Sequence, residues 1–207
     1  MQHCKIVCVG QNYRAHAEEM RSVPPAEPML FLKPSSAIIG DGETIEAPDV
    51  GRVDHEVELA LVIGRSAHRV REEDALSHVS HVAVFNDVTA RDMQTAARRA
   101  GNPWTLAKGM DTFAPMSRPV PLSRVKDVHD LDLELRVNGE VRQRGNTSDM
   151  VFSPEKLVVY ISRFMTLEPG DIIATGTPEG VSALQDGDRV EATIPGVGVV
   201  RNLFRRV

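Results

Sequence analysis

A series of short apolar or β-branched runs, separated by turn residues, restricts the fold of this chain more than any other feature. The runs span residues 5–9, 55–63, 82–87, 131–137, 171–175 and 189–194. Their length is typical of strands, because a helix would need a longer periodic segment. Glycine and proline are spread along the whole sequence, as in many short elements joined by turns. The sequence therefore predicts an α+β, mainly β fold: a mixed β-roll rather than alternating βα units.

One segment carries the full signature of a helix. Ser153 is a favourable N-cap, and Pro154 suits the first helical position. The apolar residues that follow at helical spacing are Leu157, Val158, Ile161, Phe164 and Met165. Shorter helices are expected around residues 14–20, 72–79 and 93–100. We expect these helices at the periphery of the β-roll.

Length and composition narrow the class of protein. The 207 residues are enough to bury one hydrophobic core, so we expect a single domain over residues 1–207. A net charge of -5 and only 4% aromatic residues are unfavourable for binding nucleic acid. No apolar run approaches the roughly 18 residues of a membrane helix, and the first residues lack the pattern of a secretion signal. We therefore expect a cytoplasmic protein without a nucleic-acid or membrane partner.

The two cysteines, Cys4 and Cys8, lie in or beside the first predicted strand. Four residues of a strand span roughly 13 Å, which is too far for a disulfide. We expect buried thiols, as in a reducing compartment.

Two carboxylates share one face of the predicted strand 55–63. The strand period of two places Glu56 and Glu58 on the same side. A half-buried strand with a solvated acidic face would show the same pattern. However, Ala60 and Val62 continue the line of the two glutamates, so the charges stand among apolar neighbours and need a cation. Ligands that are all oxygen atoms favour Mg2+ over zinc.

Four further residues have roles that no single motif decides. Asp87 ends a predicted strand and is the candidate third ligand, although a turn aspartate would look the same. His16 and Glu19 are three residues apart, so on a helix they share a face, and a carboxylate beside an imidazole orients a general base. Lys108 alone would be taken for a surface lysine.

Taken together and in order, these segments carry a family resemblance. The quoted motifs are Gly10-Gln11-Asn12-Tyr13 with His16 and Glu19, Phe31-Leu32-Lys33-Pro34, Asp54-His55-Glu56-Val57-Glu58-Leu59, Asp87-Val88-Thr89-Ala90-Arg91-Asp92-Met93-Gln94, Lys108, and Thr175-Gly176-Thr177-Pro178-Glu179-Gly180. From about residue 4 to the C-terminus, the chain resembles the fumarylacetoacetate hydrolase superfamily. The resemblance is to its short single-domain branch of acylpyruvate hydrolases and oxaloacetate tautomerases or decarboxylases.

The resemblance implies a set of site residues and partners. The implied ligands of Mg2+, with Mn2+ or Ca2+ as substitutes, are Glu56, Glu58 and Asp87. The implied catalytic residues are His16, Glu19 and Lys108, with the first two on a lid over about residues 12–28. The implied substrate-binding residues are Lys33, Arg91, Gln94 and Thr177. The resemblance implies a mixed β-roll fold, small 2-oxo acids as substrates, and a homodimer as the usual assembly.

The resemblance leaves the reaction open. The first expectation is Mg2+-dependent hydrolysis of the carbon–carbon bond of a 2,4-dioxo acid of the acylpyruvate or fumarylpyruvate type, through a pyruvate enolate. The alternative is an oxaloacetate tautomerase or decarboxylase, or a 2-hydroxyhepta-2,4-diene-1,7-dioate isomerase, which uses the same metal site without water attack. Residues 103–108 resemble the acylpyruvase branch, whereas residues 108–115 resemble the isomerases. A catalytically silent metal-binding protein is the third alternative, since fold alone does not decide function.

Overall fold

The apolar runs of the sequence form the central strands of the protein. The computed structural model describes residues 4–19 and 25–207, without the side chains of residues 16–18. The strands are β1 (Lys5–Gly10), β2 (Met29–Pro34), β3 (Ile38–Ile39), β4 (Thr44–Ala47), β5 (Val53–Asp54), β6 (Val57–Ile63), β7 (Val79–Asn86), β8 (Thr89–Ala90), β9 (Ala114–Pro115), β10 (Val120–Pro121), β11 (Asp132–Val137), β12 (Glu140–Asn146), β13 (Ile172–Ala174), β14 (Arg189–Ile194) and β15 (Gly198–Arg206).

The helices are short and surround the sheets, as predicted. They are α1 (Arg14–Glu19), α2 (Arg91–Ala100), α3 (Thr105–Lys108) and α4 (Pro154–Phe164), with 3-10 turns η1 (Ser35–Ala37), η2 (Glu72–His78), η3 (Leu122–Arg124) and η4 (Thr147–Asp149). Ser153 caps α4 by accepting a hydrogen bond from the Lys156 N–H, and Pro154 begins the helix. The helix expected at residues 72–79 is the 3-10 helix η2. No helix within the described ranges is long and apolar enough to cross a membrane.

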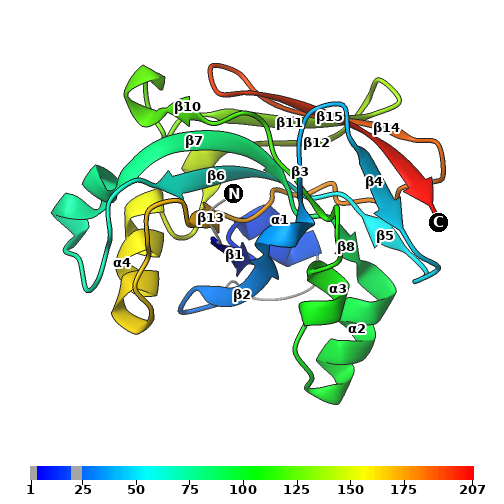
Figure 1. Cartoon of the computed structure of the whole chain (residues 1–207), viewed down its shortest axis with the longest axis horizontal. Coiled ribbons are helices and arrows are strands. Elements are labelled where there is room, and N and C mark those ends of the chain that lie inside the picture. The colour runs from blue at the N-terminus through cyan, green and yellow to red at the C-terminus, as the bar shows by residue number, and fades with distance from the viewer. Residues whose placement is uncertain (1–3, 20–24) are drawn as a thin grey trace.

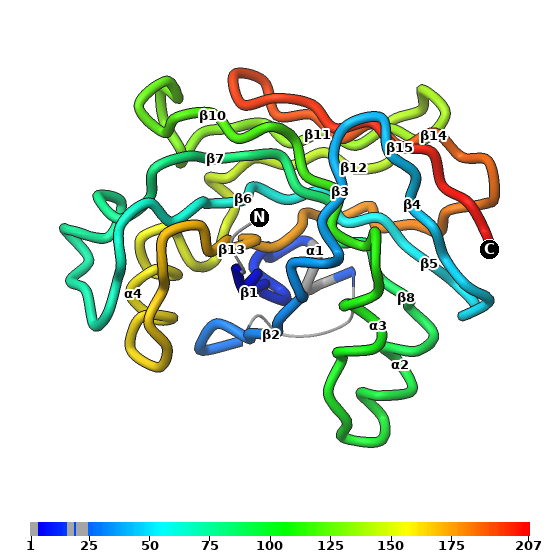
Figure 2. The backbone as a smooth tube through the Cα atoms, viewed as in Figure 1, coloured from blue at the N-terminus to red at the C-terminus, as the bar shows by residue number. Residues whose placement is uncertain are grey.

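Two sheets form the β-roll. One has six strands in the order β10-β7-β6-β13-β1-β2, and the other has five in the order β12-β11-β14-β15-β4. Pairing is mixed, because β1 runs parallel to β13 whereas β6 and β7 form an antiparallel pair. In Figure 1 the strands β11 and β15 of the five-stranded sheet lie above β6, α4 lies on one side, and α2 and α3 project on the other. The C-terminal strand β15 runs beside β4 (Figure 2), which is far away in sequence.

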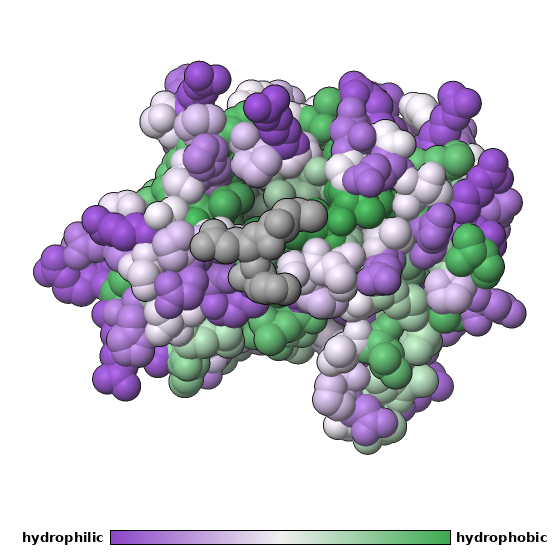
Figure 3. Space-filling view, in the orientation of Figure 1, coloured by the Kyte–Doolittle hydropathy of each residue, from purple (hydrophilic) through white to green (hydrophobic). Residues whose placement is uncertain are grey.

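The strand β6 is buried on both faces. Leu59 and Leu61 belong to a large apolar cluster that also contains Leu135 of the second sheet. Ala60, on the other face, packs in a second cluster with Cys8. Hydrophobic residues also show near the middle of the face drawn in Figure 3, with hydrophilic residues toward its margin. A solvated acidic face on this strand, one of the two interpretations of the sequence, is therefore wrong.

The cysteines are free thiols, as expected, although only Cys8 is fully buried and Cys4 is half-buried. Burial raises the pKa of the Cys8 thiol well above its usual value. The Cys8 side chain is therefore an unreactive part of the core.

Candidate active site

Three carboxylates meet where β6 and β7 join. Glu56 immediately precedes β6, Glu58 lies in it, and Asp87 immediately follows β7. The antiparallel register pairs Val57 with Asn86, and the Asp87 N–H donates to the Glu56 carbonyl at 2.8 Å. One oxygen from each of the three carboxylates lies within 4.8 Å of the other two. The three residues are 5%, 1% and 1% exposed, respectively, so their charges must be compensated inside the protein.

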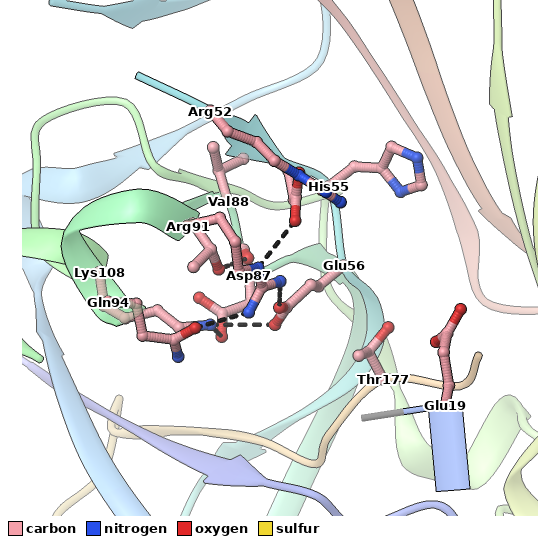
Figure 4. Close-up of polar contacts among 12 residues, drawn as sticks. Glu19, Arg52, His55, Glu56, Asp87, Val88, Arg91, Gln94, Lys108 and Thr177 are labelled. Atoms are coloured by element: carbon pink, nitrogen blue, oxygen red, sulfur yellow. Dashed lines mark hydrogen bonds and ion pairs between the residues drawn. The ribbon is translucent and has the colours of Figure 1, made fainter. Parts of the chain in front are cut away.

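Lys108, at the end of α3, supplies part of this compensation. Its Nζ lies 2.9 Å from Glu56 Oε2 and 2.5 Å from Asp87 Oδ2 (Figure 4). Burial lowers the pKa of Lys108, but the carboxylates of Asp87 and Glu56 outweigh burial and raise it above the usual value. Lys108 is therefore a buried ammonium ion at neutral pH.

Lys33, on β2, holds Asp87 from the other side. Its Nζ lies 2.8 Å from Asp87 Oδ1 and donates to the carbonyls of Val88 and Phe113 at 2.9 and 2.6 Å. The contact with Asp87 is an ion pair, whereas the two carbonyls accept hydrogen bonds from the ammonium group. The residue does not line the pocket at the triad. Its observed role is to fix Asp87, and the substrate contact expected for Lys33 stays a prediction.

Arg91, at the start of α2, contacts three protein groups. Its Nε donates to Asp54 Oδ2 at 2.7 Å, one Nη donates to Gln94 Oε1 at 2.6 Å, and the other pairs with Glu56 (Figure 4). Burial lowers the pKa of Arg91, but Glu56 and Asp54 raise it further, so it stays charged. Because Gln94 accepts through its oxygen, the donor end of its amide remains for another partner.

Glu58 faces the loop that follows β13. Its Oε2 accepts a hydrogen bond from the Gly176 N–H at 2.8 Å. Gly176 has φ of 98°, and a Cβ here would lie 2.7 Å from the Asn12 side chain, so glycine is required. Burial, followed by the charges of Asp87 and Glu56, raises the pKa of Glu58 well above its usual value. Glu58 therefore keeps its proton to a higher pH than a free glutamate does.

A cavity of about 70 Å³ opens onto the triad. Gln94 and Thr177 provide polar groups in its wall, and Met29, Phe31 and Trp104 provide an apolar side. The Lys108 Nζ lies 4.8 Å from the centroid of the Phe31 ring. The cavity suits a small anionic molecule with one apolar side.

The predicted lid dyad is only partly described. Glu19, drawn in Figure 4, lies at the end of α1. Each of its carboxylate oxygens lies 3.3 Å from the Gly180 N, whose N–H donates to them, and Gly180 belongs to the loop that holds Thr177. The backbone of His16 lies in α1, but its side chain lies outside the described residues. So do residues 20–24 of the predicted lid over residues 12–28. The pairing of His16 with Glu19 stays a prediction.

Sequence reasoning missed two residues beneath the pocket. Gln143, on β12, is buried, while its neighbours in that strand are exposed or half-buried. It contacts His55 and Thr177, at 2.9 and 2.8 Å. Burial lowers the pKa of His55, so the imidazole is neutral at neutral pH. The motif containing His55 was recognised, but β12 has no apolar alternation that would have indicated Gln143.

Comparison with known proteins covers almost the whole chain. The sequence profile described as Fumarylacetoacetate (FAA) hydrolase C-terminal matches residues 5–205. The oxaloacetate tautomerase FAHD1 of Arabidopsis thaliana, described as mitochondrial, is 49% identical over 208 residues, covering 100% of this chain and 93% of the relative. The corresponding protein of Bos taurus is 47% identical, covering 93% of this chain and 87% of the relative.

Solved structures with the same fold include enzymes of two kinds. The fumarylpyruvate hydrolase of Pseudomonas aeruginosa, in complex with Mn2+ and pyruvate, has a TM-score of 0.94 and 36% identity, covering 98% of this chain and 90% of that one. The 2-hydroxyhepta-2,4-diene-1,7-dioate isomerase of Mycobacterium marinum has a TM-score of 0.86 and 42% identity, and the match covers 98% of this chain and 74% of that one.

Proposed function

The chain belongs to the fumarylacetoacetate hydrolase family, and we propose that it catalyses the metal-dependent enolisation of a small 2-oxo acid, with oxaloacetate tautomerisation as its reaction. The observation that carries this proposal is the buried Lys108 ammonium, which pairs with Glu56 and Asp87 and lines the pocket. A fixed positive charge in a dry site stabilises the negative charge that develops on an enolate oxygen. The similarity to oxaloacetate tautomerases supports the choice of substrate.

A divalent cation fits the donor set at the triad. Glu56, Glu58 and Asp87 offer oxygen atoms only, within 4.8 Å of one another, which suits Mg2+ or Mn2+ better than zinc. We propose Mg2+, with Mn2+ as a substitute. When bound, the cation would polarise the 2-oxo group and share the charge of the enolate.

The remaining pocket residues bind and orient the acid. Tautomerisation moves a proton from the carbon next to the oxo group to the oxo oxygen and requires no attacking water. The third N–H bond of the Lys108 ammonium donates a hydrogen bond to the developing oxyanion, while Gln94 and Thr177 offer donors to a carboxylate. Phe31 and Trp104 restrict water on the apolar side. Arg91 orients Gln94 and lines the pocket, and its hydrogen bonds to protein groups use three of the five N–H bonds of the guanidinium group.

Hydrolysis of an acylpyruvate is the second candidate, and the position of Glu19 favours it. Its carboxylate contacts the loop that carries Thr177, so a base held by Glu19 would reach the pocket. In this reaction His16 takes the proton of an attacking water. The sequence alone placed hydrolysis first; enolisation is preferred here because the named tautomerases are more similar to this chain than the solved fumarylpyruvate hydrolase is.

Two variants assayed on three substrates distinguish the reactions. Lys108→Met and His16→Ala are compared with the wild type at fixed Mg2+, by ultraviolet absorbance for oxaloacetate enolisation and by NMR for acetylpyruvate and fumarylpyruvate cleavage. We expect Lys108→Met to lower enolisation more than His16→Ala does. Under the hydrolase alternative, His16→Ala lowers cleavage by about 10²- to 10⁴-fold. Fast wild-type cleavage with slow enolisation would reverse the proposal, and inactivity on all three substrates would refute both candidates.

We also propose that residues 1–207 form one catalytic domain that assembles as a homodimer. Light scattering after gel filtration should then give twice the chain mass of 22.7 kDa. A location in the cytoplasm stays a prediction.

A further inference from the structure

A chain of hydrogen bonds runs beneath the pocket from the half-buried Ser182 to the buried Thr177. Ser182 Oγ lies 2.8 Å from His55 Nε2, and His55 Nδ1 lies 2.9 Å from Gln143 Oε1. Gln143 Nε2 donates to Thr177 Oγ1 at 2.8 Å. His55, Gln143 and Thr177 are all at most 3% exposed. Thr177 lines the pocket at the triad, whereas the other three residues do not.

Two backbone groups fix the orientation of the Gln143 amide. The Val57 N–H lies 3.0 Å from one end of the amide and can only donate, so that end is the oxygen. The Pro178 carbonyl lies 2.9 Å from the other end and can only accept, so that end is the nitrogen. Both constraints give the same orientation, and a flipped amide would satisfy neither.

The orientation of Gln143 in turn fixes the proton on His55. Since Gln143 Oε1 can only accept, His55 Nδ1 must carry the hydrogen. His55 Nε2 then accepts from the Ser182 hydroxyl. Figure 4 shows the His55 ring turned away from Lys108 and Asp87, so it does not face the reacting groups.

The same argument fixes what Thr177 can offer. Its oxygen already accepts a hydrogen bond from Gln143, so the remaining hydroxyl hydrogen is available to donate. We propose that Gln143 is a positioning residue that makes Thr177 a hydrogen-bond donor to an anionic oxygen of the substrate, with His55 and Ser182 holding Gln143 in place. The inference deepens the proposed function, because the acceptor is the bound 2-oxo acid.

The packing of the loop against β12 supports this arrangement. A Cβ at Gly145 would overlap the Pro178 side chain, and a Cβ at Gly180 would overlap the Arg142 carbonyl. The loop that carries Thr177 therefore lies directly on β12, and only glycine permits the close approach. Gln143 lies between these two contacts on β12, and its hydrogen bond fixes the position of the Thr177 hydroxyl relative to the strand.

The first test measures the His55 tautomer, which requires no turnover. In protein labelled with 15N at its seven histidines, the His55 signal is assigned by its loss in His55→Asn. We expect an Nδ1–H imidazole with an unprotonated Nε2. An Nε2–H tautomer would overturn the inference, whatever the activity of the protein.

The second test is a double-mutant cycle on oxalate binding to the Mn2+-loaded protein. Thr177→Val removes the hydroxyl that donates to the substrate. Gln143→Glu keeps an oxygen toward the Val57 N–H but replaces the amide nitrogen by a second oxygen, so the Thr177 hydroxyl donates to residue 143 instead of to the substrate. We expect each change to weaken oxalate binding by roughly 10- to 100-fold, the usual effect of one hydrogen bond to a charged group. The double variant should bind no more weakly than Thr177→Val, and Thr177→Ser should retain most of the affinity. Calorimetric Mn2+ affinity serves as the control for an intact triad.

If the losses of oxalate affinity in the two single variants add in the double variant, Gln143 acts independently of Thr177, and the inference is overturned. Wild-type protein that does not bind oxalate would overturn it as well. Should Gln143→Glu fail to fold, Gln143→Asn repeats the cycle without a new charge and with the same expectation of non-additivity. Absence of oxaloacetate turnover, with the expected tautomer and cycle, would refute the proposed function alone.

Discussion

Replacing Lys108 by methionine removes the buried ammonium and keeps a side chain of similar length. The Nζ lies 2.9 and 2.5 Å from the carboxylates of Glu56 and Asp87. Each pair is worth roughly 6 kcal/mol of Coulomb energy at an effective dielectric constant of about 20. Desolvation of the ammonium offsets part of this energy, and removing one partner of a buried pair typically costs about 3–5 kcal/mol. We expect the free energy of unfolding of the metal-free protein to fall by that amount.

Thermal unfolding in EDTA, followed by circular dichroism, measures this loss. For a chain of this size the melting temperature should fall by about 6–20 °C. Arg71→Met is the matched control, because Arg71 also pairs with two carboxylates, those of Glu73 and Asp74, but is 71% exposed. No measurable change is expected for the control.

Metal binding gives an independent measurement on the same variant. Mn2+ should bind Lys108→Met more tightly than wild type, because the ammonium no longer repels the cation or occupies oxygens of Glu56 and Asp87. Mn2+ at about 100 times its dissociation constant would return about 2.7 kcal/mol of stability. If Lys108→Met has the same melting temperature as the wild type in EDTA, or binds Mn2+ more weakly, then Lys108 does not compensate the negative charge of the three carboxylates.

Two other substitutions test the same cluster. Glu58→Gln should weaken Mn2+ binding in calorimetry and stabilise the metal-free protein at pH 7–8. Because burial raises the pKa of Glu58, the stability linked to its proton is full below the usual value of 4.5 and is lost as pH rises through the raised pKa. The advantage of Glu58→Gln in urea unfolding should therefore grow with pH, and a constant difference would contradict the assigned shift. Lys33→Met leaves Asp87 and two buried carbonyls without their donor, so urea unfolding should show a loss of about 3–5 kcal/mol. If the free energy of unfolding falls no more than it does when an exposed lysine is replaced, then Asp87 is held by Lys108 alone.

Local patterns predicted the elements whose residues alternate or repeat strongly. The predicted strand at residues 189–194 coincides with β14, and the capped helix after Ser153 is α4. By contrast, β12 was missed because its residues are mostly polar and exposed, and its pairing with β11 provides what the pattern lacks. β2 was missed because Lys33 and Pro34 interrupt its short apolar run, although pairing with β1 holds all six residues extended.

The sequence by itself determined that Glu56 and Glu58 point the same way, because side chains alternate along any extended backbone. Family resemblance added Asp87 and Lys108 as expected members of the site. Only the tertiary structure decided that Lys33 holds Asp87 and that Gln143 supports Thr177. These contacts join segments 54 and 34 residues apart, so they depend on strand register and loop packing, which no local pattern specifies.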